Sequence, residues 1–440
     1  MTTDSVLLIR AVDASATYLS FRWLDDPANP EVHTVTGPGL RHTLSRLDAA
    51  LIGPADDTSP SSPSLRSPAD AAVRAALTGP FTRPISEYAL AEVLTRTILP
   101  ETVRRQLLAR ATRGTVRVRI TPSRALARVP FELLLVGDHQ RLIEVADISY
   151  DPPSAIHLRR GRLPEPWTAQ MRARPVVYAV EPLLPGGSGL RSILGRGARA
   201  TPNRRVFAHH VAAQPHTEYS SVTSTFTRHD LSDDLSTGPG RLFYFGHVSS
   251  TLDQPGSAAL HFSDDDQEWG LAAPLHHAHR PLSALDLLVG TVAPELGPGD
   301  TEPERPGIPG HELWPMPPRV AIIACEGGAD YRSSEAFGLV MAILNAGAEV
   351  LTTTRWTLPS DEAFRQICDV ETVPGPTTEL ALAVDASHTA DDPVAALARW
   401  QRRKLAQWRS DPGAATSPLT WAALGCHVCP PRKVQAPDAR

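Results

Sequence analysis

The sequence predicts an α/β fold built around a mostly parallel central sheet. Five short apolar runs rich in β-branched and aromatic residues predict buried strands, at residues 116–120, 175–180, 241–248, 320–325 and 348–356. Between the last two runs lies an apolar helical segment, 335–347, and its final Gly347 suits a helix C-cap. A strand, a helix and a strand in this order predict a parallel unit with a right-handed crossover.

The amino-terminal part begins with β-type sequence. Residues 5–13 and 16–24 are two such runs separated by a short polar step, which predicts a hairpin. A helical pattern follows at 41–52. Residues 53–70 are rich in Pro, Ser and Asp, a composition typical of a linker or surface loop.

Two helices are predicted next, at 87–99 after Ser86 and at 101–111 after Pro100. We therefore expect a small α+β regulatory or docking region at 1–110 and a larger domain at 111–440. The first part shows no tetratricopeptide periodicity.

Long polar insertions interrupt the larger domain at 183–205 and 293–319. Both come shortly before strands that carry the candidate site described below. Loops of this length are either functional or solvated decoration, so covering of a cleft and surface variation both stay open.

Composition narrows the functional classes. The 440 residues are 42% hydrophobic and carry a formal net charge of −5, which gives no broad basic field and disfavours nucleic acid as a direct partner.

The sequence has no apolar stretch of membrane-spanning length, and its start lacks the basic residues of a signal peptide, so we expect a cytoplasmic protein with no membrane partner. Four cysteines are too few for a disulfide framework. Lys404 and Lys433 are the only lysines, and this Arg bias favours a GC-rich bacterial genome.

Cys325 and His247 are the candidate catalytic residues. Each ends an apolar strand-like run beside glycine, and sites in open α/β sheets form beyond the carboxyl ends of the strands. A thiolate is a strong nucleophile, and a neighbouring imidazole both lowers the thiol pKa and protonates the leaving amine. The two residues together predict a thiol protease dyad. The alternatives are a buried structural cysteine and a satisfied structural histidine.

The residues around Cys325 match part of a known signature. Ala324-Cys325-Glu326-Gly327 fits the Ala-Cys-x-Gly part of the local caspase pattern, although Ile323 replaces its Gln.

Ordered blocks across roughly residues 111–428 resemble the CHAT family of caspase-like proteases. The blocks are ARVPFELL (127–134), RLIEVADISYDPP (141–153), PVVYAV (175–180), RLFYFGHV (241–248), ALDLL (284–288), VAIIACEGG (320–328), the long segment 337–363 and PLTWAAL (418–424). The resemblance implies a caspase-like three-layer α/β/α sandwich.

The resemblance also implies site roles. His247 and Cys325 take the places of the family dyad, and the backbone N–H groups of Val248 and Cys325 those of the oxyanion hole. Gly246, Glu326, Trp356 and Asp361 are expected on the substrate side of the cleft.

Two positions depart from the family pattern. Val248 stands where the family has glycine, and a valine resists positive φ, which predicts a reshaped turn with reduced activity. Ile323 replaces the usual serine and leaves no acid for a basic side chain on the amino side of the scissile bond (P1).

We expect a cysteine endopeptidase that cleaves a partner protein in a bacterial stress, conflict or antiviral pathway. Its substrate is expected to be encoded by a neighbouring gene, and an activating sensor protein is a second expected partner. No cofactor is expected. The alternative is a catalytically weak or inactive scaffold, favoured by Val248, whereas a serine hydrolase lacks the G-x-S-x-G motif.

We expect no metal site either. A zinc site could be drawn from His276, His277 and His279 or from Cys426 and Cys429, but the C-terminal pair also suits a core strand. The acidic run Asp264-Asp265-Asp266 is typical of a solvated turn, with a cation site as the alternative.

Overall fold

The computed structural model describes a set of residues with internal gaps. These residues are 5–52, 68–153, 156, 160–186, 188, 190, 192–194, 201–214, 220–250, 254, 256–290, 307–324 and 338–429. Cys325 and Glu326, the predicted linker up to residue 67 and parts of both long insertions lie outside them.

The predicted apolar runs form strands. The strands of the large sheet are β1 (Ser5–Asp13), β2 (Ala16–Trp23), β3 (Asp26–Thr36), β4 (Val116–Thr121), β5 (Ala146–Tyr150), β6 (Val176–Val180), β7 (Ser220–Val222), β8 (Arg241–Gly246), β12 (Arg319–Ala324), β13 (Val350–Thr354) and β14 (Leu424–Val428). A second, small sheet contains β9 (Val248–Ser249), β10 (Ala259–Leu260) and β11 (Leu282–Ser283).

The large sheet has the order β3-β2-β1-β4-β5-β14-β13-β12-β8-β6-β7. Its strands pair in parallel except at β1–β2, β2–β3 and β13–β14. The predicted opening hairpin is confirmed as β1–β2. β12 and β13 are parallel neighbours, as the strand, helix and strand pattern predicted. The expectation of an α/β fold with a mostly parallel sheet is therefore confirmed.

Helices form where the sequence is amphipathic or apolar. Those of the first half are α1 (Gly37–Asp48), α2 (Pro68–Leu77), α3 (Pro84–Ile98), α4 (Glu101–Ala111), α5 (Leu142–Val145) and α7 (Ala169–Arg172). Those of the second half are α8 (Thr201–Ala212), α9 (Arg228–Ser236), α10 (Ala284–Val289), α11 (Gly310–Leu313), α12 (Leu339–Asn345), α13 (Asp361–Cys368), α14 (Pro376–His388), α15 (Pro393–Ser410) and α16 (Pro418–Trp421). Single 3₁₀ turns include η1 (Pro80–Thr82), η2 (Phe131–Leu133) and η4 (Ala414–Thr416).

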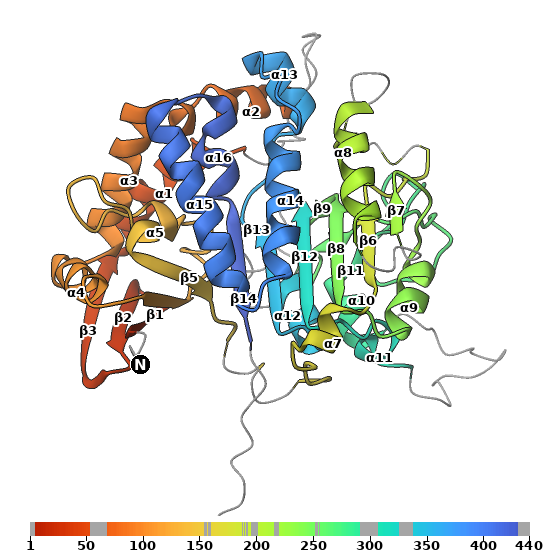
Figure 1. The fold of residues 1–440 in the computed structure, drawn as a ribbon, viewed down its shortest axis with the longest axis horizontal. Coiled ribbons are helices and arrows are strands. Elements are labelled where there is room, and N and C mark those ends of the chain that lie inside the picture. The colour runs from red at the N-terminus through yellow and green to blue at the C-terminus, as the bar shows by residue number, and fades with distance from the viewer. Residues whose placement is uncertain are drawn as a thin grey trace, which may run out of the picture.

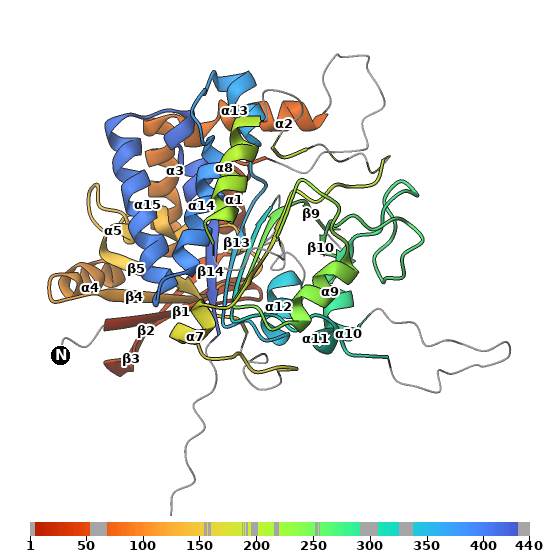
Figure 2. The ribbon, with the colours of Figure 1, turned by 45° about the vertical axis from the view of Figure 1, so that its right-hand side comes forward.

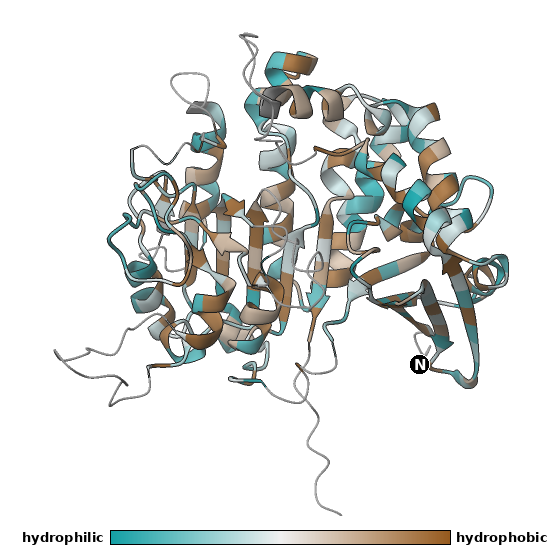
Figure 3. Ribbon diagram, turned by 180° about the vertical axis from the view of Figure 1, so that it is seen from behind, coloured by the Kyte–Doolittle hydropathy of each residue, from teal (hydrophilic) through white to brown (hydrophobic). Residues whose placement is uncertain are grey.

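Alternating side chains of the central strands pack on opposite faces of the sheet. Along β12, Val320, Ile322 and Ala324 pack in one apolar cluster, which includes residues of α9, α10 and α12. Ala321 and Ile323 pack in the other, with α8, α14 and α15. This follows from the two-residue period of a strand. The result is the predicted three-layer α/β/α arrangement (Figures 1 and 2), and the central strands carry much of the apolar sequence (Figure 3).

The amino-terminal strands continue the large sheet rather than forming a separate one. β1 pairs in parallel with β4, from Ser5 beside Val116 to Arg10 beside Thr121. Helices α1 and α3 also contribute to the apolar cluster shared with α14 and α15. The predicted boundary at residue 110 therefore runs through a continuous sheet and core, and the regulatory role of residues 1–110 stays a prediction.

Candidate active site

The two candidate residues follow strand ends that are matched in register. β8 and β12 are parallel neighbours, and their last residues, Gly246 and Ala324, face each other. His247 follows Gly246, and Cys325 is bonded to Ala324. Neighbouring strands lie about 4.8 Å apart, and consecutive Cα atoms about 3.8 Å. The strand that precedes His247 and the strand that precedes Cys325 therefore end side by side at the same edge of the sheet.

Gly246 ends β8 because a larger residue would not fit there. A Cβ at this position would lie 2.5 Å from the ring and hydroxyl of Tyr244. The Tyr244 hydroxyl in turn donates to the carbonyl oxygen of His247 at 2.7 Å. The run predicted as one strand over 241–248 is thus two strands, since the chain leaves the large sheet at His247 and enters the small one at Val248.

The end of β12 is held in a similar way. The hydroxyl of Thr354, which is fully buried in β13, donates to the carbonyl oxygen of Ala324. A buried hydroxyl therefore holds the backbone at His247 and at the residue that precedes Cys325.

A chain of hydrogen bonds runs behind His247. The His279 Nδ1 lies 2.6 Å from the carbonyl oxygen of Asp264, which can only accept, so this nitrogen carries a proton. Burial lowers the pKa of His279, so the ring is neutral and its Nε2 accepts from His261 Nδ1 at 3.0 Å. Burial, then charge interactions with His279 and His247, lower the pKa of His261 too, so its Nε2 accepts from the Ser249 hydroxyl at 2.9 Å. All these hydrogen bonds therefore point the same way, from Ser249 toward Asp264.

A small cavity opens beside His247. Its volume is about 150 Å³. Its walls come from the ends of β8 and β12, from the segments that precede α8 and α13, and from the first turn of α14. The lining residues described are Ser192, Ile193, Phe245, His247, Ile323, Ala324, Leu358, Ser360 and Thr377. Sequence reasoning missed most of them: Leu358 and Ser360 lie inside a block that resembles the CHAT family, but Thr377 and Ser192 carry no signal of their own.

Asp361 supports the cavity wall from behind. Its carboxylate accepts from the backbone N–H of Thr377 at 2.8 Å, from Thr378 and from Asn203 at 3.0 Å. Burial raises its pKa. Trp356 lies in the core, with no exposed surface, where it stacks on Phe81 and its indole N–H donates to the carbonyl oxygen of Leu419 at 2.9 Å.

Glu181 is a buried acid at the end of β6, the other neighbour of β8. Its side chain accepts from the Ser192 hydroxyl and from the backbone N–H of Leu194 at 3.2 Å, and Arg204 lies 4.0 Å from it. Its φ of 48° is unusual for a residue with a side chain. Glu181 was not singled out from the sequence, where it is one acid at the start of a long polar segment.

Val248 takes its place in the small sheet without positive φ. It pairs with Leu260 of β10, and its side chain is buried in the apolar cluster with α9 and α10. A β-branched residue suits this extended backbone. The residue after His247 is therefore the first residue of strand β9 and not part of a turn that needs glycine.

The other histidines and cysteines singled out from the sequence have different surroundings. His279 belongs to the hydrogen-bond chain above, and His276 lies 3.1 Å from the carbonyl oxygen of Ser188. Cys426 is buried in β14, and Cys429 is buried just beyond it. Among the described residues no group of three or more His, Cys, Asp or Glu side chains is arranged to hold a metal. Asp264 pairs with buried Arg228 at 3.4 Å.

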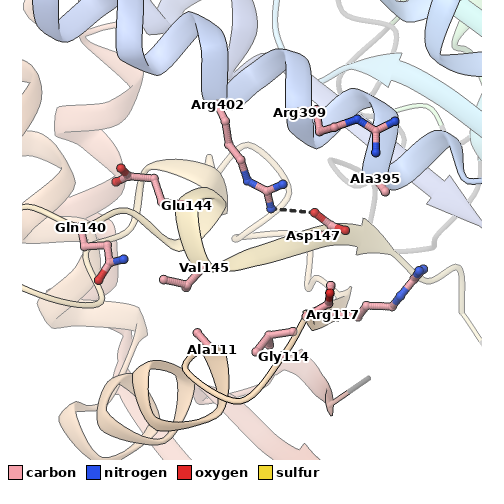
Figure 4. Close-up of a pocket in the computed structure, with 12 residues that line it drawn as sticks. Ala111, Gly114, Arg117, Gln140, Glu144, Val145, Asp147, Ala395, Arg399 and Arg402 are labelled. Atoms are coloured by element: carbon pink, nitrogen blue, oxygen red, sulfur yellow. Dashed lines mark hydrogen bonds and ion pairs between the residues drawn. The ribbon is translucent and has the colours of Figure 1, made fainter. Parts of the chain in front are cut away.

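A larger pocket lies on another part of the sheet, at the amino ends of β4 and β5 (Figure 4). Its volume is about 670 Å³. Three arginines reach it, but Arg402 pairs with Asp147 at 2.6 Å and Arg117 with Asp392 at 2.6 Å. The described residues that line it include neither a cysteine nor a histidine. Of the two pockets, the smaller one is therefore lined by the candidate catalytic residue His247.

The fold is a caspase-like, protease-type scaffold, and a histidine and a cysteine follow the register-matched ends of two of its adjacent parallel strands. The chain matches the CHAT domain family over residues 88–369, more than half of its length, and belongs to that family. The resemblance drawn from the sequence blocks is thereby confirmed.

The chain is similar to a chain of the solved separase–securin complex of Saccharomyces cerevisiae, with 9% identity and a TM-score of 0.44. The similarity covers 96% of this chain and spans only 30% of that one. No curated protein matches the chain.

No described helix is both long and apolar enough to cross a bilayer.

Proposed function

We propose that this protein is a cysteine endopeptidase in which Cys325 is the nucleophile and His247 the general acid and base. The observation that carries the proposal is the register pair Gly246–Ala324, which are the residues just before His247 and Cys325 on adjacent parallel strands. Membership of the CHAT family supports the same chemistry.

The reaction would run through a covalent acyl-enzyme. The Cys325 thiolate attacks the scissile carbonyl carbon, and the carbonyl electrons move to the oxygen, where backbone N–H groups near Val248 and Cys325 stabilise them. As the tetrahedral intermediate collapses, the carbon–nitrogen bond breaks and the protonated His247 gives its proton to the leaving amine. Water, deprotonated by the neutral His247, then hydrolyses the thioester and restores the thiol.

The surroundings of His247 suit this role. The Tyr244 hydroxyl and the backbone N–H of His261 both hold the His247 carbonyl oxygen, at 2.7 and 3.2 Å. The nearby His261 and His279 are neutral at neutral pH, so neither places a positive charge that would oppose protonation of His247 during turnover.

The proposal extends to the biological setting. CHAT membership favours a substrate that is a partner protein, encoded near this gene and cut at few sites. It also favours an activating sensor protein and a cytoplasmic role in bacterial stress or antiviral defence. An inactive scaffold is the competing function, and the test below separates the two.

The experiment compares wild type with Cys325→Ala, His247→Ala and the control Cys368→Ala. Candidate partner proteins are incubated with each, with and without neighbouring gene products. Cleavage is expected from wild type and the control and from neither dyad variant. Wild type that cleaves nothing under any condition would favour the scaffold.

Thiol labelling gives a second readout that does not need the substrate. Burial raises the pKa of Cys368 and Cys429, and raises that of Cys426 to about 11. At pH 6, iodoacetamide is therefore expected to label Cys325 before the other three cysteines, and His247→Ala should slow that labelling. Equal labelling of Cys325 and Cys368 in wild type would count against an activated thiol.

A further inference from the structure

The cavity beside His247 is lined by residues at the ends of the two strands that precede the candidate dyad. Phe245 and His247 come from the end of β8, and Ile323 and Ala324 from the end of β12. The carbonyl carbon attacked by Cys325 belongs to the P1 residue, whose side chain is only one carbon further away. P1 is therefore the substrate residue that can fill this cavity while its carbonyl meets the thiol.

We propose that this cavity selects a medium-sized apolar P1 side chain, such as leucine, methionine or phenylalanine. The inference rests on the proposed protease function and adds the substrate class to it.

The volume of the cavity supports this size range. It holds about 150 Å³, and an engineered cavity of about this volume with apolar walls is known to take up benzene. A leucine or phenyl side chain fits such a space, whereas glycine or alanine leaves most of it unfilled.

The chemistry of the walls supports an apolar occupant. Ile193, Phe245, Ile323, Ala324 and Leu358 supply apolar surface. The remaining described lining residues are two serines, one threonine and His247, so no carboxylate or guanidinium group lines the cavity among them. A charged P1 side chain would lose its water without gaining an ionic partner among these described residues, which is costly.

Two buried acids, Asp361 and Glu181, contact residues of the cavity wall. Asp361 accepts from Thr377, Thr378 and Asn203. Glu181 Oε1 accepts from the Ser192 hydroxyl and from the backbone N–H of Leu194, whereas Glu181 Oε2 has no hydrogen-bond partner among the described residues and lies 4.0 Å from Arg204. A basic P1 side chain would have to compete with Ser192 and Arg204 for the Glu181 carboxylate.

The test measures kcat/KM for peptides that differ only at P1, with Leu, Met, Phe, Ala, Lys, Arg and Asp in turn. Wild-type protein is expected to cleave the Leu, Met and Phe peptides at least about tenfold faster than the Ala, Lys, Arg and Asp peptides.

A designed variant tests the same cavity. Ser360 caps α13, and its hydroxyl accepts from the backbone N–H of Ala363 at 3.2 Å. Aspartate is an equally good cap, so Ser360→Asp should fold while placing a carboxylate at the cavity wall. It should raise cleavage after Lys and Arg relative to Leu by about tenfold. The matched control is Thr168→Asp at the cap of α7, away from the cavity, which should leave the P1 preference unchanged.

The outcomes separate the inference from the proposed function. Wild-type preference for Lys or Arg that Glu181→Gln abolishes would overturn the apolar assignment and identify Glu181 as the recognition residue. Preference for Asp would also overturn it. In both cases the protease function would stand, whereas failure to cleave any peptide or protein would remove the proposed function itself.

Discussion

Burial decides the protonation state of His261 and His279. Both rings lie behind His247, and their hydrogen bonds run from the Ser249 hydroxyl to the carbonyl oxygen of Asp264. Because that carbonyl can only accept and burial lowers the pKa of both rings, each histidine carries its proton on Nδ1. In the sequence, His261 and His279 are two of 16 histidines and lie 18 residues apart, with nothing to show that their rings meet.

This tautomer assignment can be checked directly. Nitrogen-15 spectra of histidine-labelled protein at pH 7.5 are expected to show a protonated Nδ1 and a bare Nε2 for both His261 and His279. Ser249→Ala should lower the free energy of unfolding by about 1–3 kcal/mol, because a buried Nε2 loses its donor. Ser250→Ala, one residue along, is the control and should have little effect. Spectra with the proton on Nε2 in either ring would contradict the assignment.

Among elements, a buried ion pair joins η2 to the ends of β13 and β14. Arg355 donates to both carboxylate oxygens of Glu132, at 2.8 and 2.6 Å, and to the carbonyl oxygen of Leu424. Both partners are about 5% exposed or less. Glu132 and Arg355 belong to two separate sequence blocks that resemble the CHAT family. The ion pair shows that these two blocks contact each other in the fold.

Breaking this pair should be costly. Glu132→Ala leaves the Arg355 guanidinium buried without its counter-charge, so we expect a loss of about 3–5 kcal/mol in the free energy of unfolding, measured by urea denaturation. The control is Glu92→Ala, which removes an exposed partner of Arg96 on α3 and should cost less than about 0.5 kcal/mol. Similar losses in the two variants would show that burial does not set the strength of the Glu132 pair.

The stability of the whole molecule should depend on acid pH through its buried histidines. Burial, aided by Arg319, lowers the pKa of His388 to about 3, and burial with Arg355 does the same for His427. Since the unfolded pKa is about 6.5, the unfolded state gains these protons first as pH falls. The stabilisation is therefore complete above about pH 7 and is lost progressively from about 6.5 toward 3.

The test compares wild type with His388→Gln by urea denaturation at several pH values between 7.5 and 5. His388 contacts Thr352 at 2.8 Å, and the charged groups that act on it are Arg319, Asp385 and Arg241. The variant should show a shallower loss of stability, by up to about 1.4 kcal/mol per pH unit. Parallel curves for the two proteins would show that His388 does not titrate on unfolding.

At the same scale, the amino-terminal region was predictable as secondary structure but not as part of the sheet. The hairpin and the helices α3 and α4 follow from local patterns. The pairing of β1 with β4 joins residues about a hundred positions apart, and local patterns carry no information on which strands become neighbours.

The sequence by itself determined the α/β class, most strands and helices, the family and the choice of His247 and Cys325, because apolar periodicity and glycine turns act over a few residues. Only the tertiary structure decided that Gly246 and Ala324 face each other, and that Ser192, Leu358 and Thr377 meet at one cavity. Strand register and side-chain packing depend on contacts between distant segments. They arise only when the whole sheet and its two helical layers assemble.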